Sequence, residues 1–242
     1  MSERRSPDTP FLGGQGDSFG TAEEHRDIVF RAEPSVRGLA LDALRAMSGS
    51  GDEAEANYQS ALSALRERPE EAVAAIGATY DSLEEEQYLE RWSMVQLLTD
   101  LRMSQSVEVL EDVLRQPIPP ERSRDPAHGV STVGEEVMIR TTAVEALVRL
   151  LADGDQAAGR SLLEYTRHEA ISVRRAAVQG LIASGDRTLA QQVEEAVKGT
   201  DDEWMLGVRR MDVREVPQAD GRQYLRPSTA EGDSMPPEPL TR

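Results

Sequence analysis

The sequence predicts an all-α protein, an α-solenoid in which antiparallel helix pairs stack side by side, with flexible N- and C-terminal tails. A motif recurs at Val36–Leu44, Ile139–Leu147 and Val173–Leu181, each time as an apolar residue, Arg, two variable residues, Ala, an apolar residue, two variable residues and Leu. Arg140 and Arg174, from the last two copies, lie 174 − 140 = 34 residues apart, which is room for two short helices and their turns. Aromatic residues make up only 4% of the chain, so Leu, Val and Ala must fill its core.

The first expected helices follow from local start and stop signals. Helical periodicity begins near Ala22 and strengthens at Pro34, which suits the first turn of a helix, and the Gly- and Ser-rich residues 48–51 end that helix. Asp52 is expected to cap the second helix, and Leu89 keeps the spacing of a buried face in the fourth. The further helices are expected over residues 52–66, from Pro69, over 84–101 and over 104–116.

The stretch over residues 117–134 interrupts the array. It contains four prolines, so it cannot be a helix, and it is too long for a turn between repeats. A weaker copy of the motif begins at Arg91, and its distance from Arg140 is 140 − 91 = 49 residues, 15 more than the 34-residue period. A loop of this length is either tolerated or functional, and we look here first for a partner contact.

From residue 135 onward the pattern is regular, and Asp155 and Asp186 are each placed to cap the helix that follows. The apolar residues Trp204 and Met205 can cover the open end of the last helix pair. The expected segments are a disordered Gly- and Pro-rich arm over 1–20, a solenoid over 21–200 with helix pairs 135–151/155–167 and 170–183/187–198, a cap or extended strap over 201–216, and a disordered tail over 217–242.

The motif copies at Ile139–Leu147 and Val173–Leu181 resemble the first helix of a HEAT repeat, in its short bacterial form. The likeness is strongest over about residues 84–200, and the Pro-rich insertion and Met94, in place of Ala, depart from it. It implies an α-solenoid whose second helices line a concave face that binds proteins or, in some members, nucleic acid, and it implies no particular reaction. In the HEAT pattern the motif arginine pairs with acids and carbonyls of neighbouring repeats, so the resemblance implies a structural role for Arg37, Arg140 and Arg174.

Composition narrows the classes of partner. The formal net charge of −17 argues against nucleic acid and against an anionic membrane surface, because both need concentrated Lys and Arg. Another protein with a basic surface is the better electrostatic match. The chain has no Cys, which excludes disulfides and thiolate chemistry. No segment approaches the ~18 apolar residues of a membrane span, and the start lacks the apolar run of a signal peptide, so we expect a cytoplasmic protein.

The sequence offers little material for catalysis. Its three histidines have no second His or carboxylate at a helix-spaced metal-ligand interval with apolar support. His128, in the insertion, is the single candidate, and a lone loop histidine is far more often solvated than catalytic. Residues 201–203 resemble a cation site only in their density of acids. We therefore expect no enzyme, no catalytic residue, no metal and no cofactor.

The expected function is that of a non-catalytic scaffold or adaptor that binds a protein partner along its concave helical surface. One alternative is self-assembly, or a structural subunit, in which the Phe-bearing N-terminal arm occupies a groove. Another is a HEAT-like enzyme or accessory factor, bilin-lyase-like or DNA-binding glycosylase-like, which the acidic charge disfavours. The expected partner-binding residues are Glu108, Glu111, Asp112, Arg115, Gln156, Arg160, Glu164 and Arg167 of the second helices, with Phe11, Phe19 and His128.

Overall fold

The computed structural model describes residues 28–30 and 32–207, and every regular element within them is helical, with no strand. The all-α prediction is confirmed for this part of the chain. The elements are α1 (Pro34–Met47), α2 (Asp52–Arg66), α3 (Pro69–Tyr80), α4 (Tyr88–Leu101), α5 (Ser106–Arg115), α6 (Thr132–Ala152), α7 (Gln156–Tyr165), α8 (Ile171–Ala183), α9 (Arg187–Val197) and a 3₁₀ helix, η2 (Glu203–Gly207).

Side-chain caps fix the starts of the later helices. The carboxylate of Asp155 accepts hydrogen bonds from the first backbone N–H groups of α7, at 2.8 and 3.2 Å, and Asp186 does the same for α9. Both predicted caps are therefore confirmed. The predicted cap at Asp52 is wrong: Gly51 holds the cap position with φ 88°, and Asp52 is the first helical residue, where its charge favours the helix dipole.

Two helices begin elsewhere than predicted. α4 starts at Tyr88 because Glu84 and Gln87 close a turn, in which the Glu84 N–H donates to the Gln87 side chain at 2.8 Å. α6 starts at Thr132, inside the predicted insertion, because the Ser131 hydroxyl accepts from the Gly134 N–H at 2.9 Å and caps the helix. Leu89, predicted to be buried, is exposed on the first turn of α4.

The chain enters the first helix as an extended segment. Helix was predicted from about Ala22, but residues 28–30 and 32–33 are not helical. Ile28 and Phe30 are buried and Val29 between them is exposed, so the two inward side chains alternate with an outward one. The arm and tail predicted over residues 1–20 and 217–242 lie outside the described residues.

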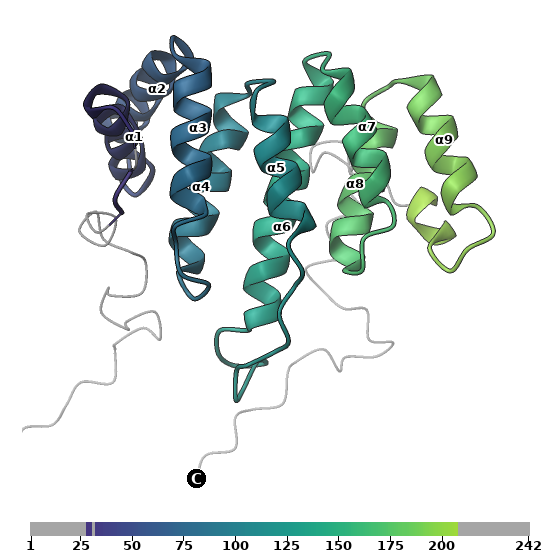
Figure 1. Cartoon of the computed structure of the whole chain (residues 1–242). Coiled ribbons are helices and arrows are strands. Elements are labelled where there is room, and N and C mark those ends of the chain that lie inside the picture. The colour runs from purple at the N-terminus through teal and green to yellow at the C-terminus, as the bar shows by residue number, and fades with distance from the viewer. Residues whose placement is uncertain (1–27, 31, 208–242) are drawn as a thin grey trace, which may run out of the picture. The chain divides into compact units, whose positions relative to one another are not determined.

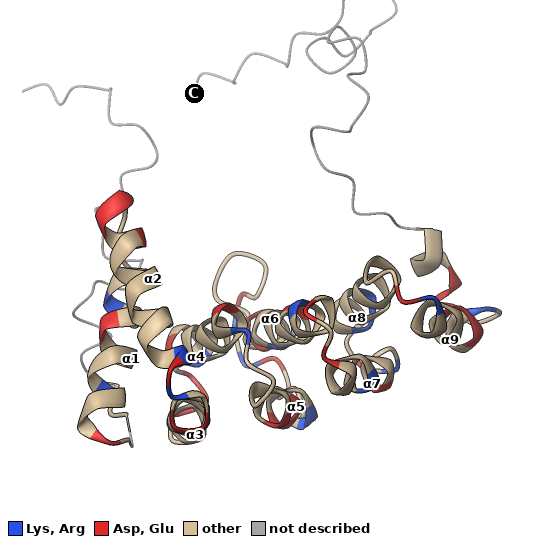
Figure 2. Ribbon diagram, turned by 90° about the horizontal axis from the view of Figure 1, so that it is seen from above, with Lys and Arg blue, Asp and Glu red and all other residues tan. Residues whose placement is uncertain are grey.

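The helices after the α1–α2 hairpin form two rows. α4, α6 and α8 lie side by side in one row, and α3, α5 and α7 lie side by side in the other (Figures 1 and 2). The chain alternates between the rows, so each helix is followed by one from the opposite row. The core lies between them and consists mainly of Leu, Val and Ala.

Small residues in the motif set the spacing within the α4–α6–α8 row. Ala143 and Ala177, the alanines of the motif in α6 and α8, are fully buried. α6 and α8 approach so closely at Gly180 that a β-carbon there would lie 2.1 Å from Cγ2 of Val148. A larger residue at this point would force the two helices apart.

The C-terminal end of the row is only partly covered. Met205 of η2 is buried, and its carbonyl accepts a hydrogen bond from the Gln179 side chain of α8 at 2.5 Å. Trp204, predicted to help cover this end, is instead 47% exposed. Residues 208–216, predicted to continue the cap as a strap, lie outside the described part of the chain.

Candidate interaction surfaces

The buried arginine of the motif copy at Ile139–Leu147 holds the start of the Pro-rich loop in place. Arg140 is 1% exposed and donates to the carbonyls of Gln116 and Pro117 at 3.0 and 3.3 Å. It also forms an ion pair with Glu136, one turn earlier on α6. Arg140 therefore ties the end of α5 to the α6 helix.

Glu136 lies between two arginines. Its carboxylate also accepts from Arg91 of α4, and Arg91 donates to the Tyr80 hydroxyl at 3.0 Å. Burial opposes the charge on Arg91, but the hydrogen bonds to Glu136 and Tyr80 raise its pKa, so the guanidinium stays charged. Both carboxylate oxygens are engaged by arginines, which leaves no free base. The cluster therefore joins α3, α4 and α6.

The other motif arginines also bind carbonyls and acids. Arg37 donates to the Ala32 carbonyl at 3.0 Å. Arg174 donates to the carbonyls of His168 and Glu169, each at 2.9 Å, and pairs with Asp202 at 2.8 Å. Arg140 and Arg174 bind both carbonyls and acids, as the resemblance implied, whereas within the described residues the Arg37 side chain binds one carbonyl, five residues before it, and no acid. Asp202, considered for a cation site, is instead the partner of an arginine.

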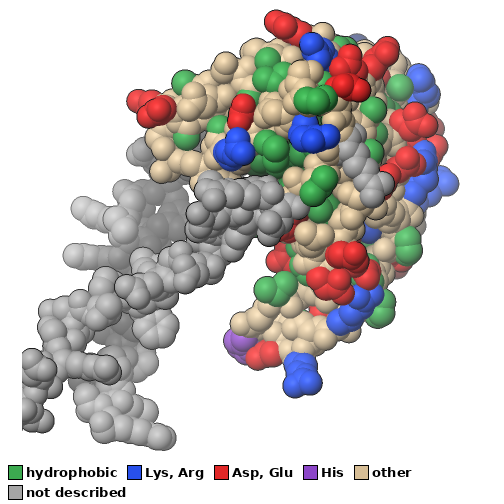
Figure 3. Space-filling model, turned by 60° about the vertical axis from the view of Figure 1, so that its left-hand side comes forward, with side chains coloured by type: hydrophobic (Ala, Val, Ile, Leu, Met, Phe, Trp, Pro, Cys, Tyr) green, Lys and Arg blue, Asp and Glu red, His purple; other side chains and the backbone are tan. Residues whose placement is uncertain are grey.

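The predicted partner-binding residues line the outward sides of α5 and α7, and we call this surface the α5–α7 strip. Its side chains are exposed, apart from the half-buried Glu111. Arg115 pairs with Glu111 and Asp112 on its own helix, and the Tyr165 hydroxyl of α7 donates to the Glu111 carbonyl at 3.2 Å. At the α1–α2 end of the molecule, which faces the viewer in Figure 3, charges of both signs are also intermixed. The strip consists of Glu108, Glu111, Asp112, Arg115, Gln156, Arg160, Glu164 and Arg167.

His128 lies apart from the strip. It stands near the tip of the loop between α5 and α6, where its Nδ1 lies 3.0 Å from the Asp125 carboxylate and its ring is largely exposed. Across the described ranges no group of three or more His, Asp or Glu side chains could hold a metal ion. None of the helices there has the length and apolarity needed to cross a membrane. Phe11 and Phe19 lie outside the described residues.

The same loop is firmly attached at its base. The Glu121 carboxylate accepts from the Ser131 hydroxyl at 2.5 Å and from the N–H groups of Ser123 and Thr132 at 2.8 and 3.0 Å. The Ser131 hydroxyl contributes most to lowering the pKa of Glu121, which falls from 4.5 to about 2. Arg122 adds an ion pair with Glu85 at 2.8 Å. The loop is thus fixed at its base, and its tip is exposed.

The opposite side of the molecule carries a connected set of side chains that sequence reasoning missed. Asp100 of α4 accepts from the Tyr58 hydroxyl of α2 at 2.8 Å, from Gln96 at 2.8 Å and from Arg149 of α6 at 2.9 Å. Burial, followed by the hydrogen bond to Asp100, raises the pKa of Tyr58. One carboxylate therefore joins three helices. We call the surface around it the central face, formed by Leu89, Trp92, Gln96 and Asp100 of α4 and Met138, Thr142, Glu145 and Arg149 of α6.

The central face combines fixed polar groups with apolar ones. The Trp92 indole N–H donates to the Thr142 hydroxyl at 3.2 Å and joins α4 to α6. Met138 is 44% exposed, and Leu89 is exposed beside it in the row. A signal for this face was present in the sequence: 149 − 100 = 49, the same offset as that between Arg91 and Arg140. Asp100 and Arg149 thus hold equivalent positions in two repeats, each two residues after the last Leu of the motif.

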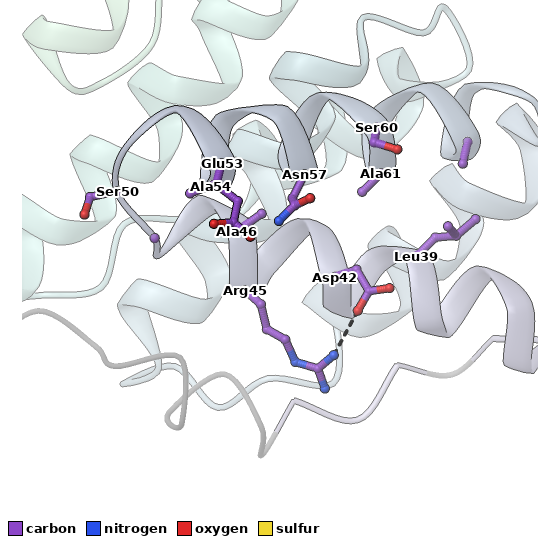
Figure 4. A pocket seen from close by; sticks show the side chains of 12 residues that line it. Leu39, Asp42, Arg45, Ala46, Ser50, Glu53, Ala54, Asn57, Ser60 and Ala61 are labelled. Carbon is purple, nitrogen blue, oxygen red and sulfur yellow. Dashed lines mark hydrogen bonds and ion pairs between the residues drawn. The ribbon is translucent and has the colours of Figure 1, made fainter.

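An open groove of about 590 Å³ lies between α1 and α2 (Figure 4). Asp42 and Arg45 form an ion pair at 2.9 Å on its α1 wall, and Glu53 and Asn57 stand on its α2 wall. Apart from Leu39, the remaining residues that line the groove have small side chains or none. We call it the α1–α2 groove, and its small lining residues are Ala46, Gly49, Ser50, Ala54, Ser60, Ala61 and Ala64.

Comparison of the chain with family models, with curated proteins and with solved structures found no match.

Proposed function

We propose that the protein is a non-catalytic scaffold, an α-solenoid of the HEAT-like type, that binds a protein partner on its central face. The recurrent motif and the two rows of helices support the architecture. The Asp100 hub carries the choice of face, because it fixes polar side chains from three helices on the face that also exposes Leu89 and Met138, about 16 Å away toward the starts of α4 and α6.

The composition of protein interfaces favours the central face over the α5–α7 strip. Interface centres are enriched in aromatic residues, Met and Arg, and are depleted of Lys, Glu and Asp. The central face offers Trp92 and Arg149, each held by a hydrogen bond, and the exposed Met138. The strip offers long charged side chains such as Arg115, whose acid partners lie on its own helix. Ordering such side chains against a partner costs entropy.

The charge of the chain points to the kind of partner. With a net charge of −17, the protein attracts basic surfaces and repels nucleic acid. No continuous basic patch is seen on the face shown in Figure 3. The proposed partner is a protein that presents a basic rim around an apolar group able to pack on Met138. The buried cluster at Glu136 has both carboxylate oxygens engaged, which supports a role without catalysis.

Affinity capture with the full chain, followed by mass spectrometry, tests the proposal. We expect Leu89→Asp combined with Met138→Asp to remove one specific partner, because both exposed apolar side chains would then carry charge. The matched control is Glu111→Arg combined with Arg160→Glu on the α5–α7 strip, which should retain the partner. Loss of the partner in the strip variant alone would move the site to the strip. If no partner is captured by any form, the scaffold function is wrong.

A further inference from the structure

The position of α8 at the end of its row leaves one side of this helix incompletely packed. Shifting by the 34-residue period relates Val148 of α6 to Ile182 of α8 (182 − 148 = 34), and Val137 to Ile171. Val148 is the side chain that meets Gly180 of the following helix. Ile171 and Ile182 therefore occupy the positions that, on α6, face the next helix in the row.

Among residues 32–207, η2 is the element that follows α8 in this place, and it covers the middle of that side. Asp202 pairs with Arg174, and the Met205 carbonyl accepts from Gln179, so η2 lies against the centre of α8. Ile171 is 52% exposed at one end of the helix and Ile182 is 37% exposed at the other. We call the resulting ridge the α8 edge, formed by Ile171, Arg175, Ile182 and Trp204.

The α1–α2 groove belongs to the first two helices, whereas the α8 edge belongs to the last helix of its row. The groove is hollow, and the edge presents bulky side chains. Seven of its twelve lining residues are Ala, Gly or Ser, which leaves room for bulky side chains from outside. Leu39 in its lining corresponds to Thr142 of α6 in the motif, since 140 − 37 and 142 − 39 are both 103. Thr142 is the residue that meets Trp92 of the preceding helix. The groove thus opens on the side of α1 where a preceding helix would lie.

We propose that the α8 edge of one molecule docks into the α1–α2 groove of a second copy, head to tail. The edge extends over 182 − 171 = 11 residues of α8, and the groove over 64 − 53 = 11 residues of α2, each about 16 Å at 1.5 Å per residue. In this arrangement the first helices of the next copy contact the two ends of α8 that η2 leaves exposed, at Ile171 and Ile182.

Charge favours the same pairing. Arg175 stands on the α8 edge between Ile171 and Ile182, and Glu53 stands on the α2 wall of the groove. Both side chains are exposed, and within residues 32–207 neither has an ion pair. The docked copies bring an unpaired cation from one end to an unpaired anion at the other.

A head-to-tail contact uses two different patches, so an open assembly of any size keeps one free edge at one end and one free groove at the other. Such a contact continues into open chains unless the rotation between copies closes a ring. The surfaces involved are separate from the central face, so this assembly is independent of the proposed partner site.

Light scattering on the full chain over a range of concentrations tests the proposal. We expect the mean mass to rise past that of a dimer, and we expect Ile182→Asp, on the edge, and Ser60→Trp, which fills the groove, each to weaken association about tenfold or more. Val130→Asp, on the exposed loop, and Gln59→Trp, beside the groove residue but outside the lining, are the matched controls and should assemble as the parent chain does.

Mixing separates head-to-tail docking from a symmetric contact. An Ile182→Asp chain keeps its groove and a Ser60→Trp chain keeps its edge, so an equimolar mixture should give a dimer that grows no further. Arg175→Glu and Glu53→Arg should each weaken assembly, and the double variant should recover it. A full chain that remains monomeric at every concentration overturns the proposal, and so does an assembly that none of these changes affects.

Discussion

Two arginines at the same position of the motif differ in almost everything around them. Arg140 is 1% exposed, pairs with Glu136, and donates to the carbonyls of Gln116 and Pro117. Arg37 is exposed, and within the described residues its guanidinium makes one hydrogen bond, to the Ala32 carbonyl. The motif thus directs a guanidinium toward the chain that precedes the helix, and the neighbouring elements decide how much stability the contact gives.

The difference arises from residues outside the motif. Arg140 lies in the middle of the α4–α6–α8 row, where α5 ends beside it and Glu136 supplies a charge from the same helix. Arg37 lies at the N-terminal end, where no helix precedes α1 among the described residues. A buried ion pair depends on having every polar atom satisfied, and only the central position meets that condition.

Removing the shared carboxylate at the central position should have the largest effect. Glu136→Ala leaves the guanidinium groups of Arg91 and Arg140 buried without a counter-charge, and we expect a loss of about 3–5 kcal/mol in the free energy of unfolding. Urea denaturation measures it. Glu135→Ala, at the adjacent position, should cost far less, and equal losses in the two variants would contradict the comparison.

Arg174 is intermediate in its surroundings and should be intermediate in its effect. It binds two carbonyls and Asp202 but remains partly accessible to water. Arg174→Ala should cost about 1–2 kcal/mol in urea denaturation, because charge-assisted hydrogen bonds are lost at a site that solvent can partly refill. The control is the neighbouring Arg175→Ala. A larger loss of stability in that variant would contradict the assignment of Arg174 as the arginine that stabilises this end of α8.

A pH dependence should accompany the Arg174 site. Burial lowers the pKa of His168 from 6.5, and the ring accepts a hydrogen bond from the Ala170 N–H at 3.0 Å. As the pH falls below 6.5 the unfolded chain takes up a proton before the folded chain does, so the stability contributed by the neutral ring is lost. Thermal melts between about pH 8 and pH 5 should show a slope that His168→Gln reduces. An unchanged slope would mean that the ring titrates alike in both states.

The exposed arginine should have the smallest effect. Arg37→Ala is expected to change the free energy of unfolding by about 0.5 kcal/mol or less, since an exposed hydrogen bond exchanges readily with water. Denaturation of this variant beside Arg140→Ala gives the contrast directly. Similar losses at both positions would mean that the motif, and not its surroundings, sets the energy.

Local signals in the sequence predicted most helix starts. They failed where contacts with distant residues determine whether a side chain is buried. Pro69 and the caps at Asp155 and Asp186 fixed their helix starts because the relevant atoms lie within three residues. α6 starts earlier than predicted because Ser131 caps it. That cap was missed because the four prolines before it favoured a loop over the whole stretch. Helical periodicity placed Leu89 on the buried side of α4. It could not show that the first turn of this helix extends past the core, which leaves Leu89 exposed.

The central face could not be predicted from local pattern. Periodicity shows which side of a helix avoids the core, and it does not show which helices share a row. Asp100 depends on Tyr58, 42 residues before it, and on Arg149, 49 residues after it. The exposed α5–α7 strip was predicted because each of its residues lies on the polar side of a single helix.

The loop between α5 and α6 makes the protein a convenient carrier for an inserted label. Glu121 and Arg122 hold its base, while the residues around Asp125 and His128 extend into solvent. A short epitope or a fluorophore-binding peptide placed after Ala127 would be displayed at a fixed site without entering a helix. Such a tagged form would allow the molecule to be followed in cells with both proposed contact regions left free.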